Sequence, residues 1–356
     1  MRSSEFMIAS HTCRRGGVRS NPHSVSRVHA GPRAHAFTLV ELLVAMAVLA
    51  IIAVVMVSMT SSVQKLTKQT SSRVEQFRES RRAFDRINQR LSQATLNAYY
   101  DYVDAGGAPR TTNNAATFTP SRYARISELR YLQTNASAFT APHGGDIKGQ
   151  AVFFQAPLGQ ADDTNLSGLD SLLNTVGYFI AKGDDSTLRP AVLAGANIPL
   201  KNRFRLFECV QPAENFSVYK YTSGSATNNT TAWVTDSLAN PTNSSPLADN
   251  IVALVFSAIY PDASGNWQTN AVYSSGPRNQ ATQAIEENNL PPKVRISMIA
   301  VDEPSARRIE DAGLSLPDAT SEAGLQSIEG LCKSNNLNYR RFESTVTIGS
   351  AKWSTK

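Results

Sequence analysis

The sequence predicts an α+β protein in which one long N-terminal helix precedes a mainly antiparallel β-sheet domain. An apolar run lies near the N-terminus, and an amphipathic pattern continues it without proline or glycine through residue 105. Short apolar runs bounded by turn residues then fill most of the remaining chain. With 356 residues and 41% hydrophobic content, the chain can bury a sizeable core.

The positive charge of the chain is concentrated at its N-terminus. Residues 1–36 contain six arginines and one glutamate, whereas residues 37–356 sum to only +1. No basic surface is implied for the bulk of the protein, so nucleic acid is not an expected partner. Residues 1–36 show no apolar periodicity, and we interpret them as a basic leader that is removed. Met1 and Met7 both remain possible starts.

Residues 37–59 are predicted to form a transmembrane helix. Sixteen consecutive apolar residues run from Leu42 to Val57, and the whole segment is long enough to cross ~30 Å of hydrocarbon at ~1.5 Å per residue. A secretory signal peptide fits less well, because "VSMTSSV" leads into more helical sequence and not into a small-residue cleavage site. Membrane lipid is therefore an expected partner.

Glu41 interrupts the apolar segment close to its start. A carboxylate inside a membrane helix costs ~2.5–3.5 kcal/mol unless it finds a partner, so an ordinary anchor gains nothing from it. One partner would be the amine created by a cut between Ala36 and Phe37, supplied by a neighbouring subunit in a packed bundle. The alternative is a glutamate that reaches the membrane interface by itself.

The stretch "FTLVELLVAMAVLAIIAVV" resembles the N-terminus of type IV prepilins and type II secretion pseudopilins. The resemblance implies a pilin-like fold, cleavage between Ala36 and Phe37 by a prepilin peptidase, and N-methylation of Phe37 by the same enzyme. Glu41 would be the carboxylate used in assembly with other pilin-like subunits. Ala36 stands where the family nearly always has glycine, and we expect the cut to occur there more slowly.

Residues 60–98 are predicted to continue the helix with one apolar face. That face contains Val63, Leu66, Val74, Phe77, Phe84, Ile87 and Leu91. The arginines are expected on the solvated side, with Glu75 and Glu79 as partners within the helix: Arg73, Arg78, Arg81, Arg82, Arg86 and Arg90. Contact of these arginines with lipid headgroups and a dimeric coiled-coil stalk are the alternatives.

Residues 99–356 are predicted to form the globular β-rich domain. We expect strands at 124–133, 150–157, 175–182, 203–210, 250–260, 293–301 and 342–348. Two helices are expected, at 166–175 and 303–313, and polar loops at 222–231 and 239–250.

Two stretches of this domain extend the resemblance. "LADNIVALVFSAIYPDASGNW" and "LPPKVRISMIAVDEPSARR" resemble the C-terminal half of J-type minor pseudopilins. The stretches "AVFFQAPLG", "LLNTVGYFIA", "RFRLFECVQPAENFSVY" and "VDEPSARR" are together similar to the Verru_Chthon cassette protein C family. That family implies an exported prepilin-like protein without an established biochemical activity.

Few residues suggest a disulfide, a metal site or a catalytic site. Cys209 and Cys332 could form a disulfide in an oxidising compartment or remain two buried thiols. His143, the single histidine after the leader, is interpreted as a turn residue because it precedes two glycines. Asp262 and Asn266 could bind calcium, but a hairpin turn explains them better. We expect no cofactor, no other metal site and no enzymatic activity.

The sequence therefore favours a minor pseudopilin or pilin subunit of a type II secretion or type IV pilus-like filament. Its helix would anchor it in the inner membrane by a single pass, with the C-terminal domain in the periplasm or in an extracellular filament. The alternative is a single-span anchored binding protein that never polymerises. An enzyme is the third and least favoured class.

Overall fold

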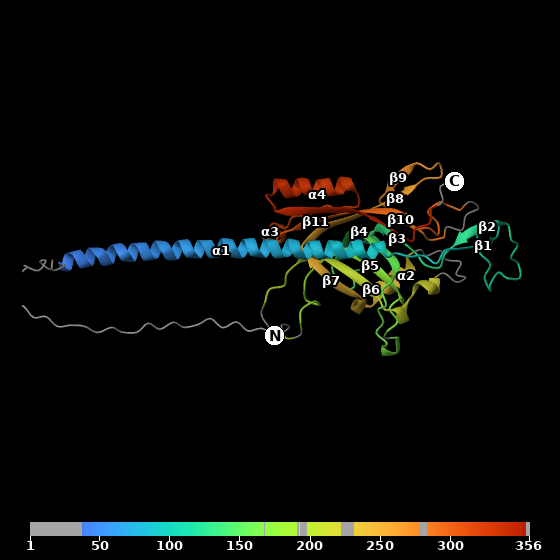
Figure 1. The fold of residues 1–356 in the computed structure, drawn as a ribbon, viewed down its shortest axis with the longest axis horizontal. Helices are drawn as coiled ribbons and strands as arrows, with labels where there is room; N and C mark the ends of the chain where they lie inside the picture. Colours follow the sequence, from blue (N-terminus) through green and yellow to red (C-terminus); the bar gives the residue numbers. More distant parts are fainter. Residues whose placement is uncertain are drawn as a thin grey trace, which may run out of the picture. The chain divides into compact units, whose positions relative to one another are not determined.

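The structure is a computed structural model that describes residues 38–166, 168–190, 192, 198–221, 231–277 and 283–353, except the side chains of Gln69 and Ser72. The chain divides between Gln64 and Lys65 into two compact units. Helix α1 (Leu39–Ser92) begins in the first unit and ends in the second (Figure 1).

The second unit contains all of the described strands. They are β1 (Tyr99–Val103), β2 (Arg122–Ile126), β3 (Leu132–Asn135), β4 (Asp146–Pro157), β5 (Leu173–Gly183), β6 (Arg203–Gln211), β7 (Ser244–Asp249), β8 (Ile251–Pro261), β9 (Trp267–Asn270), β10 (Tyr273–Ser274), β11 (Lys293–Val301) and β12 (Tyr339–Thr347). Its shorter α-helices are α2 (Ala232–Ala239), α3 (Glu303–Asp311) and α4 (Glu322–Ser334).

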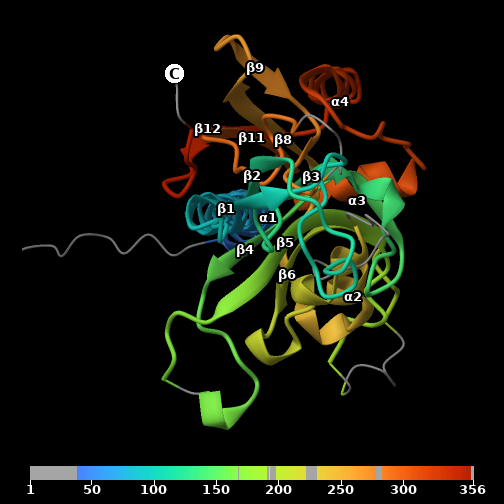
Figure 2. The same cartoon turned by 90° about the vertical axis from the view of Figure 1, so that its right-hand side faces the viewer.

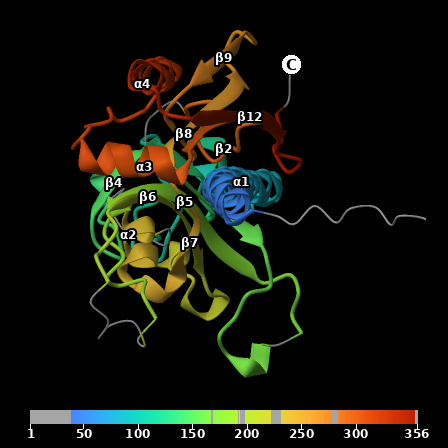
Figure 3. The ribbon, with the colours of Figure 1, turned by 90° about the vertical axis from the view of Figure 1, so that its left-hand side faces the viewer.

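The described strands form three antiparallel sheets. A six-stranded sheet has the order β10-β3-β4-β5-β6-β7, a four-stranded sheet has the order β12-β11-β8-β9, and β1 pairs with β2 alone. Figures 2 and 3 show α2 on one side of the six-stranded sheet and the four-stranded sheet with α3 and α4 on the other. The α+β class with a mainly antiparallel sheet is confirmed.

Both faces of the six-stranded sheet are buried. Along β4, Val152 and Phe154 point into the larger core, which also receives α1 and the four-stranded sheet. Phe153, between them, points into a second core with Trp233 of α2. Because side chains alternate along a strand, a strand buried on both faces is a continuous apolar run, which is what "AVFFQA" shows.

A bulge in β4 joins the two larger sheets. Gly149 has φ +70°, and a Cβ there would lie 3.0 Å from the Ala319 carbonyl oxygen, so the position favours glycine. The next residue, Gln150, accepts a hydrogen bond from the Phe256 amide of β8 at 2.7 Å and donates to the carbonyl of Ala271 at 2.8 Å. This buried amide thus links β4 to backbone groups of Phe256 and Ala271.

Some predicted elements differ from the structure. The strand expected at 124–133 is two strands, β2 and β3, in different sheets. The helix expected at 166–175 is wrong: Gly168, with φ +91°, lies in a turn, and β5 already begins at Leu173. The loop expected at 239–250 contains the edge strand β7, whose serines and aspartate gave no alternating apolar signal. The amphipathic helix ends at Ser92 and not at residue 98.

Candidate functional site

Helix α1 begins with a capped first turn. The hydroxyl of Thr38 accepts a hydrogen bond from the Glu41 amide at 3.3 Å, and the Thr38 carbonyl accepts one from the Leu42 amide at 3.2 Å. Threonine followed three residues later by glutamate is the capping-box pattern, and a carboxylate is favoured where helix amides lack partners. Glu41 therefore also suits the start of its own helix. Ala36 and Phe37 lie outside the described residues.

The first half of α1 exposes its apolar side chains throughout the first unit. Leu39 is 81% exposed and even Ile52 is 47% exposed, and no charged residue occurs between Glu41 and Lys65. Helix α1 is long and apolar enough to cross a membrane. Lipid or other apolar helices must cover this surface, since water contact with so much hydrocarbon is costly.

The second half of α1 packs on the domain through one face. Phe84, Ile87 and Leu91 are at most 1% exposed, and the Phe84 ring lies 5.8 Å from that of Phe342 on β12. Val74, predicted on the same face, is 45% exposed. The apolar face is therefore covered by the domain only over its later turns.

Arg73 is 44% exposed, as expected for the solvated side, but its partner is not a glutamate of its own helix. Its Nε lies 2.8 Å from Oδ2 of Asp302, a fully buried carboxylate. Asp302 also caps α3 by accepting a hydrogen bond from the Ser305 amide at 2.9 Å. Arg73 thus supplies the charge that a buried carboxylate requires.

Arg86, which is 43% exposed, makes a second contact of this kind with a carboxylate outside its helix. Its Nε and Nη2 donate to the two carboxylate oxygens of Glu208 at 2.8 and 2.6 Å, and Tyr178 donates to Glu208 at 2.7 Å. The side chain of Glu208 is 3% exposed. The hydrogen bond to Glu208 raises the pKa of Arg86 above its ordinary value. A bidentate contact of this kind fixes both the position of the helix along the sheet and its rotation about its own axis.

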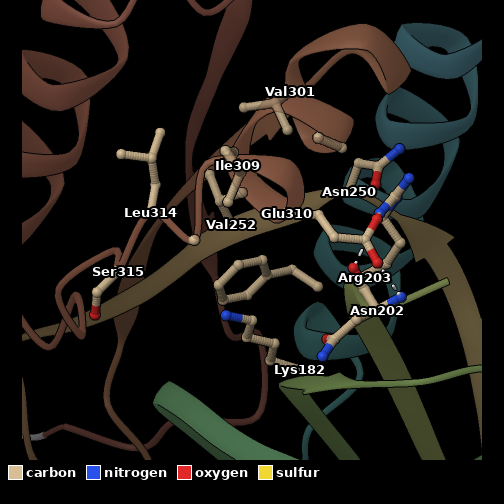
Figure 4. Close-up of a pocket in the computed structure, with 13 residues that line it drawn as sticks. Lys182, Asn202, Arg203, Asn250, Val252, Val301, Ile309, Glu310, Leu314 and Ser315 are labelled. Carbon is tan, nitrogen blue, oxygen red and sulfur yellow. Dashed lines mark hydrogen bonds and ion pairs between the residues drawn. The ribbon is translucent and has the colours of Figure 1, made fainter.

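A small cavity of about 170 Å³ lies between β6, β8 and α3 (Figure 4). On one side, Arg203 forms ion pairs with Glu303 and Glu310 of α3. On another, the ammonium of Lys182 lies 5.3 Å from the centre of the Phe204 ring. The hydrogen bond from Arg203 holds the pKa of Glu310 below its ordinary value. Arg203 and Lys182 thus already contact carboxylates and an aromatic ring of the protein itself.

The disulfide considered between Cys209 and Cys332 is not formed. Both cysteines are free and buried, and they lie in different hydrophobic cores. Burial raises the pKa of Cys209 to about 12 and that of Cys332 to about 11, so neither thiol is activated as a nucleophile.

The remaining candidate residues have structural contacts. Oδ1 of Asp262 accepts hydrogen bonds from the amides of Ser264 and Asn266 at 2.8 and 2.9 Å and closes the β8–β9 turn. His143 places Nε2 2.7 Å from the Ser244 carbonyl oxygen and stacks on Phe207. Within the residues that the structure describes, no group of three or more His, Cys, Asp or Glu side chains could hold a metal ion.

Comparison with known families concerns the N-terminal segment. Residues 31–57 match the family described as the prokaryotic N-terminal methylation motif. The segment is a prepilin-type signal. No curated protein and no solved structure matches the chain, so the match covers the signal and not the domain.

The prepilin-type signal supports a type IV prepilin-like protein that is processed by prepilin peptidase and assembles with other pilin subunits. Together with the apolar helix, it indicates a single-pass membrane anchor. The contacts of Arg73 and Arg86 were missed from the sequence, because the partner carboxylates lie more than 100 residues away in the chain. Their one sequence signal is an excess of arginine over acid in the helix.

Proposed function

We propose that the protein is a minor pseudopilin or minor pilin, cleaved between Ala36 and Phe37 and incorporated into a type II secretion or type IV pilus-like filament. The observation that carries the proposal is the prepilin-type signal at residues 31–57, together with the apolar side chains of the first half of α1, which are exposed among the described residues. Its role is structural and not enzymatic. The domain lies in the periplasm or in an extracellular filament.

The resemblance of the domain to J-type minor pseudopilins and to the Verru_Chthon cassette protein C family supports the finer assignment and a pilin-like fold. In the assembled bundle, Glu41 meets the amine of Phe37 from a neighbouring subunit. A carboxylate and an amine brought together in a dry bundle compensate the cost that each would have alone.

Mass spectrometry of the mature N-terminus tests the processing step. We expect a chain that begins at N-methylated Phe37. Recovery of the protein with its leader intact would overturn the proposal. An Ala36→Gly variant should be cut faster than the natural sequence, because glycine is the residue that prepilin-like signals usually have there.

Assembly is tested by Glu41→Ala, with Asp85→Ala as the matched control. Asp85 is a 55% exposed carboxylate of the same helix that pairs only with Arg81. We expect Glu41→Ala to abolish co-purification with other pilin-like chains and Asp85→Ala to leave it unchanged. Unchanged co-purification of Glu41→Ala would overturn the assembly role of Glu41, whereas no co-purification of the natural protein with pilin-like chains would favour the alternative, an anchored binding protein that does not polymerise.

A further inference from the structure

Three arginines of the domain are buried to more than nine-tenths, and one of them differs from the others. Arg203 and Arg205 are 4% and 5% exposed, and both pair with carboxylates: Arg203 with Glu303 and Glu310, Arg205 with Asp249 at 3.2 Å. Arg130 is 8% exposed, and none of its described contacts is with a carboxylate.

The contacts of Arg130 are all with neutral oxygens. Nη1 donates to the carbonyls of Ser127 and Leu129 and lies 3.4 Å from Oδ1 of Asn288. Glu128 and Glu287 act on it only through space, and burial lowers the pKa of Arg130 to about 10. A buried cation is costly unless an anion pairs with it. Arg130 therefore lacks the type of partner that Arg203 and Arg205 have.

Arg130 lies in the wall of a large hollow of the second unit. We call it the β1–β2 groove; its lining includes Tyr99, Val103, Arg110, Arg125, Arg130 and Asn288, and its volume is about 970 Å³. Figure 2 shows β1 and β2 at the end of the unit that faces the viewer. Ligand sites commonly have volumes of ~300–1,000 Å³, so the groove can hold a ligand of several rings.

A second guanidinium, that of Arg125, lines the groove and adds positive charge to it. Nη2 of Arg125 donates to the carbonyls of Ile285 and Glu287 at 3.1 and 3.0 Å, while its Nε is buried without a hydrogen bond among the described residues. Asn288 holds the two arginines in place: its Oδ1 faces Arg130, and its Nδ2 donates to the Arg125 carbonyl at 2.8 Å. The described lining contains four arginines against two glutamates, which favours an anion.

The rest of the groove lining indicates what kind of molecule carries the anionic group. It includes the hydroxyl groups of Thr111 and Thr112 and the side chain of Tyr99, which is 44% exposed. A sugar ring offers hydroxyl groups to such side chains and a C–H face to tyrosine. We propose that the β1–β2 groove binds an acidic saccharide, with the guanidinium of Arg130 pairing with a carboxylate of the sugar. This site is independent of filament assembly.

Isothermal titration of the full-length protein in detergent tests the site. The probes are a hexamer of galacturonate, a neutral hexamer of galactose, a hexamer of glutamate and inorganic phosphate. We expect the uronate hexamer to bind, and Arg130→Gln to weaken its binding about tenfold or more, because hydrogen bonds to charged groups are strong. Arg307→Gln removes an exposed charge on α3 and should change nothing.

Arg110→Glu is a second variant that tests the site even if Arg130→Gln does not fold. Arg110 is exposed and makes no hydrogen bond or ion pair with the described residues, so its reversal should keep the fold and repel the uronate. Unchanged uronate affinity in Arg110→Glu and in a folded Arg130→Gln would overturn the proposal. Equal or tighter binding of the neutral hexamer, the glutamate hexamer or phosphate would overturn the assignment of an acidic saccharide.

Discussion

At the scale of single residues, Arg86 shows how the domain holds its helix. The side chain is 43% exposed, yet it is the cation that contacts Glu208, whose side chain is 3% exposed. Tyr178 cannot take over this role, since its hydroxyl is neutral and burial raises its pKa well above the ordinary value. Removal of Arg86 would leave a carboxylate buried with one hydroxyl partner.

Arg86→Gln should therefore lower the free energy of unfolding by about 3 kcal/mol, the lower end of the range for breaking a buried ion pair, since Arg86 itself is half-exposed. Arg82→Gln is the matched control, because Arg82 is 76% exposed and its contact with Glu75, at 3.7 Å, is a surface ion pair. This substitution should lower the free energy of unfolding by at most ~0.5 kcal/mol. Urea unfolding of the full-length protein in detergent measures both. Equal losses would show that the Glu208 contact adds no stability.

Glu310 gives a dependence of stability on pH. Its pKa is lower in the folded protein than in the unfolded chain, chiefly because Arg203 donates a hydrogen bond to it. Ionised Glu310 therefore stabilises the fold above the unfolded pKa, and this contribution is lost as the pH falls through the folded pKa.

We accordingly expect Glu310→Gln to lower the melting temperature at pH 7 and to have little effect at pH 3. Asp311→Asn, a change of the same type at the neighbouring position of α3, is the control and should leave the pH dependence as it is. A deficit of Glu310→Gln that is equally large at both pH values would contradict the proposed role of the charge.

At the scale of elements, the spacing of apolar residues predicted the helices and strands that have a regular apolar pattern. The long helix and the buried strands β4, β5, β6, β8 and β11 were located because fully buried strands are continuous apolar runs. The short strand β1 was missed and β2 was merged with β3, because the tyrosine, arginine and aspartate residues of β1 and β2 form no apolar face. Propensity also suggested a helix at 166–175, where a left-handed glycine and the pairing of β5 with β4 prevail.

Among the candidate sites, too, a feature local in the sequence could be predicted and contacts between distant segments could not. The signal around Glu41 is local in sequence and could be predicted. The contacts of Arg73, Arg86 and Arg130 depend on which strands become neighbours, and pairing order is not written in any single segment. Nothing in "SELRYLQ" distinguishes the unpaired guanidinium of Arg130 from an exposed one.

At the scale of the whole molecule, the division between Gln64 and Lys65 separates an apolar helix from a unit that contains its own core. Arg73 of α1 forms an ion pair with Asp302, and the buried apolar side chains of α1 among the described residues begin at Ala83. The domain therefore needs the second half of α1 and not the first.

A series of truncated chains tests this division. A fragment that begins at Lys65 should be soluble, folded and close in melting temperature to the full-length protein, because it keeps Arg73 and Arg86. A fragment that begins at Phe77 should fold but melt at a lower temperature, since it leaves the fully buried Asp302 without Arg73. A fragment that begins at Tyr99 should fail to fold, because it lacks Phe84, Ile87 and Leu91 and opens the larger core. Circular dichroism and thermal unfolding of the three fragments measure these differences. Equal melting temperatures for the fragments that begin at Lys65 and Phe77 would mean that the Arg73 contact contributes no stability to the domain.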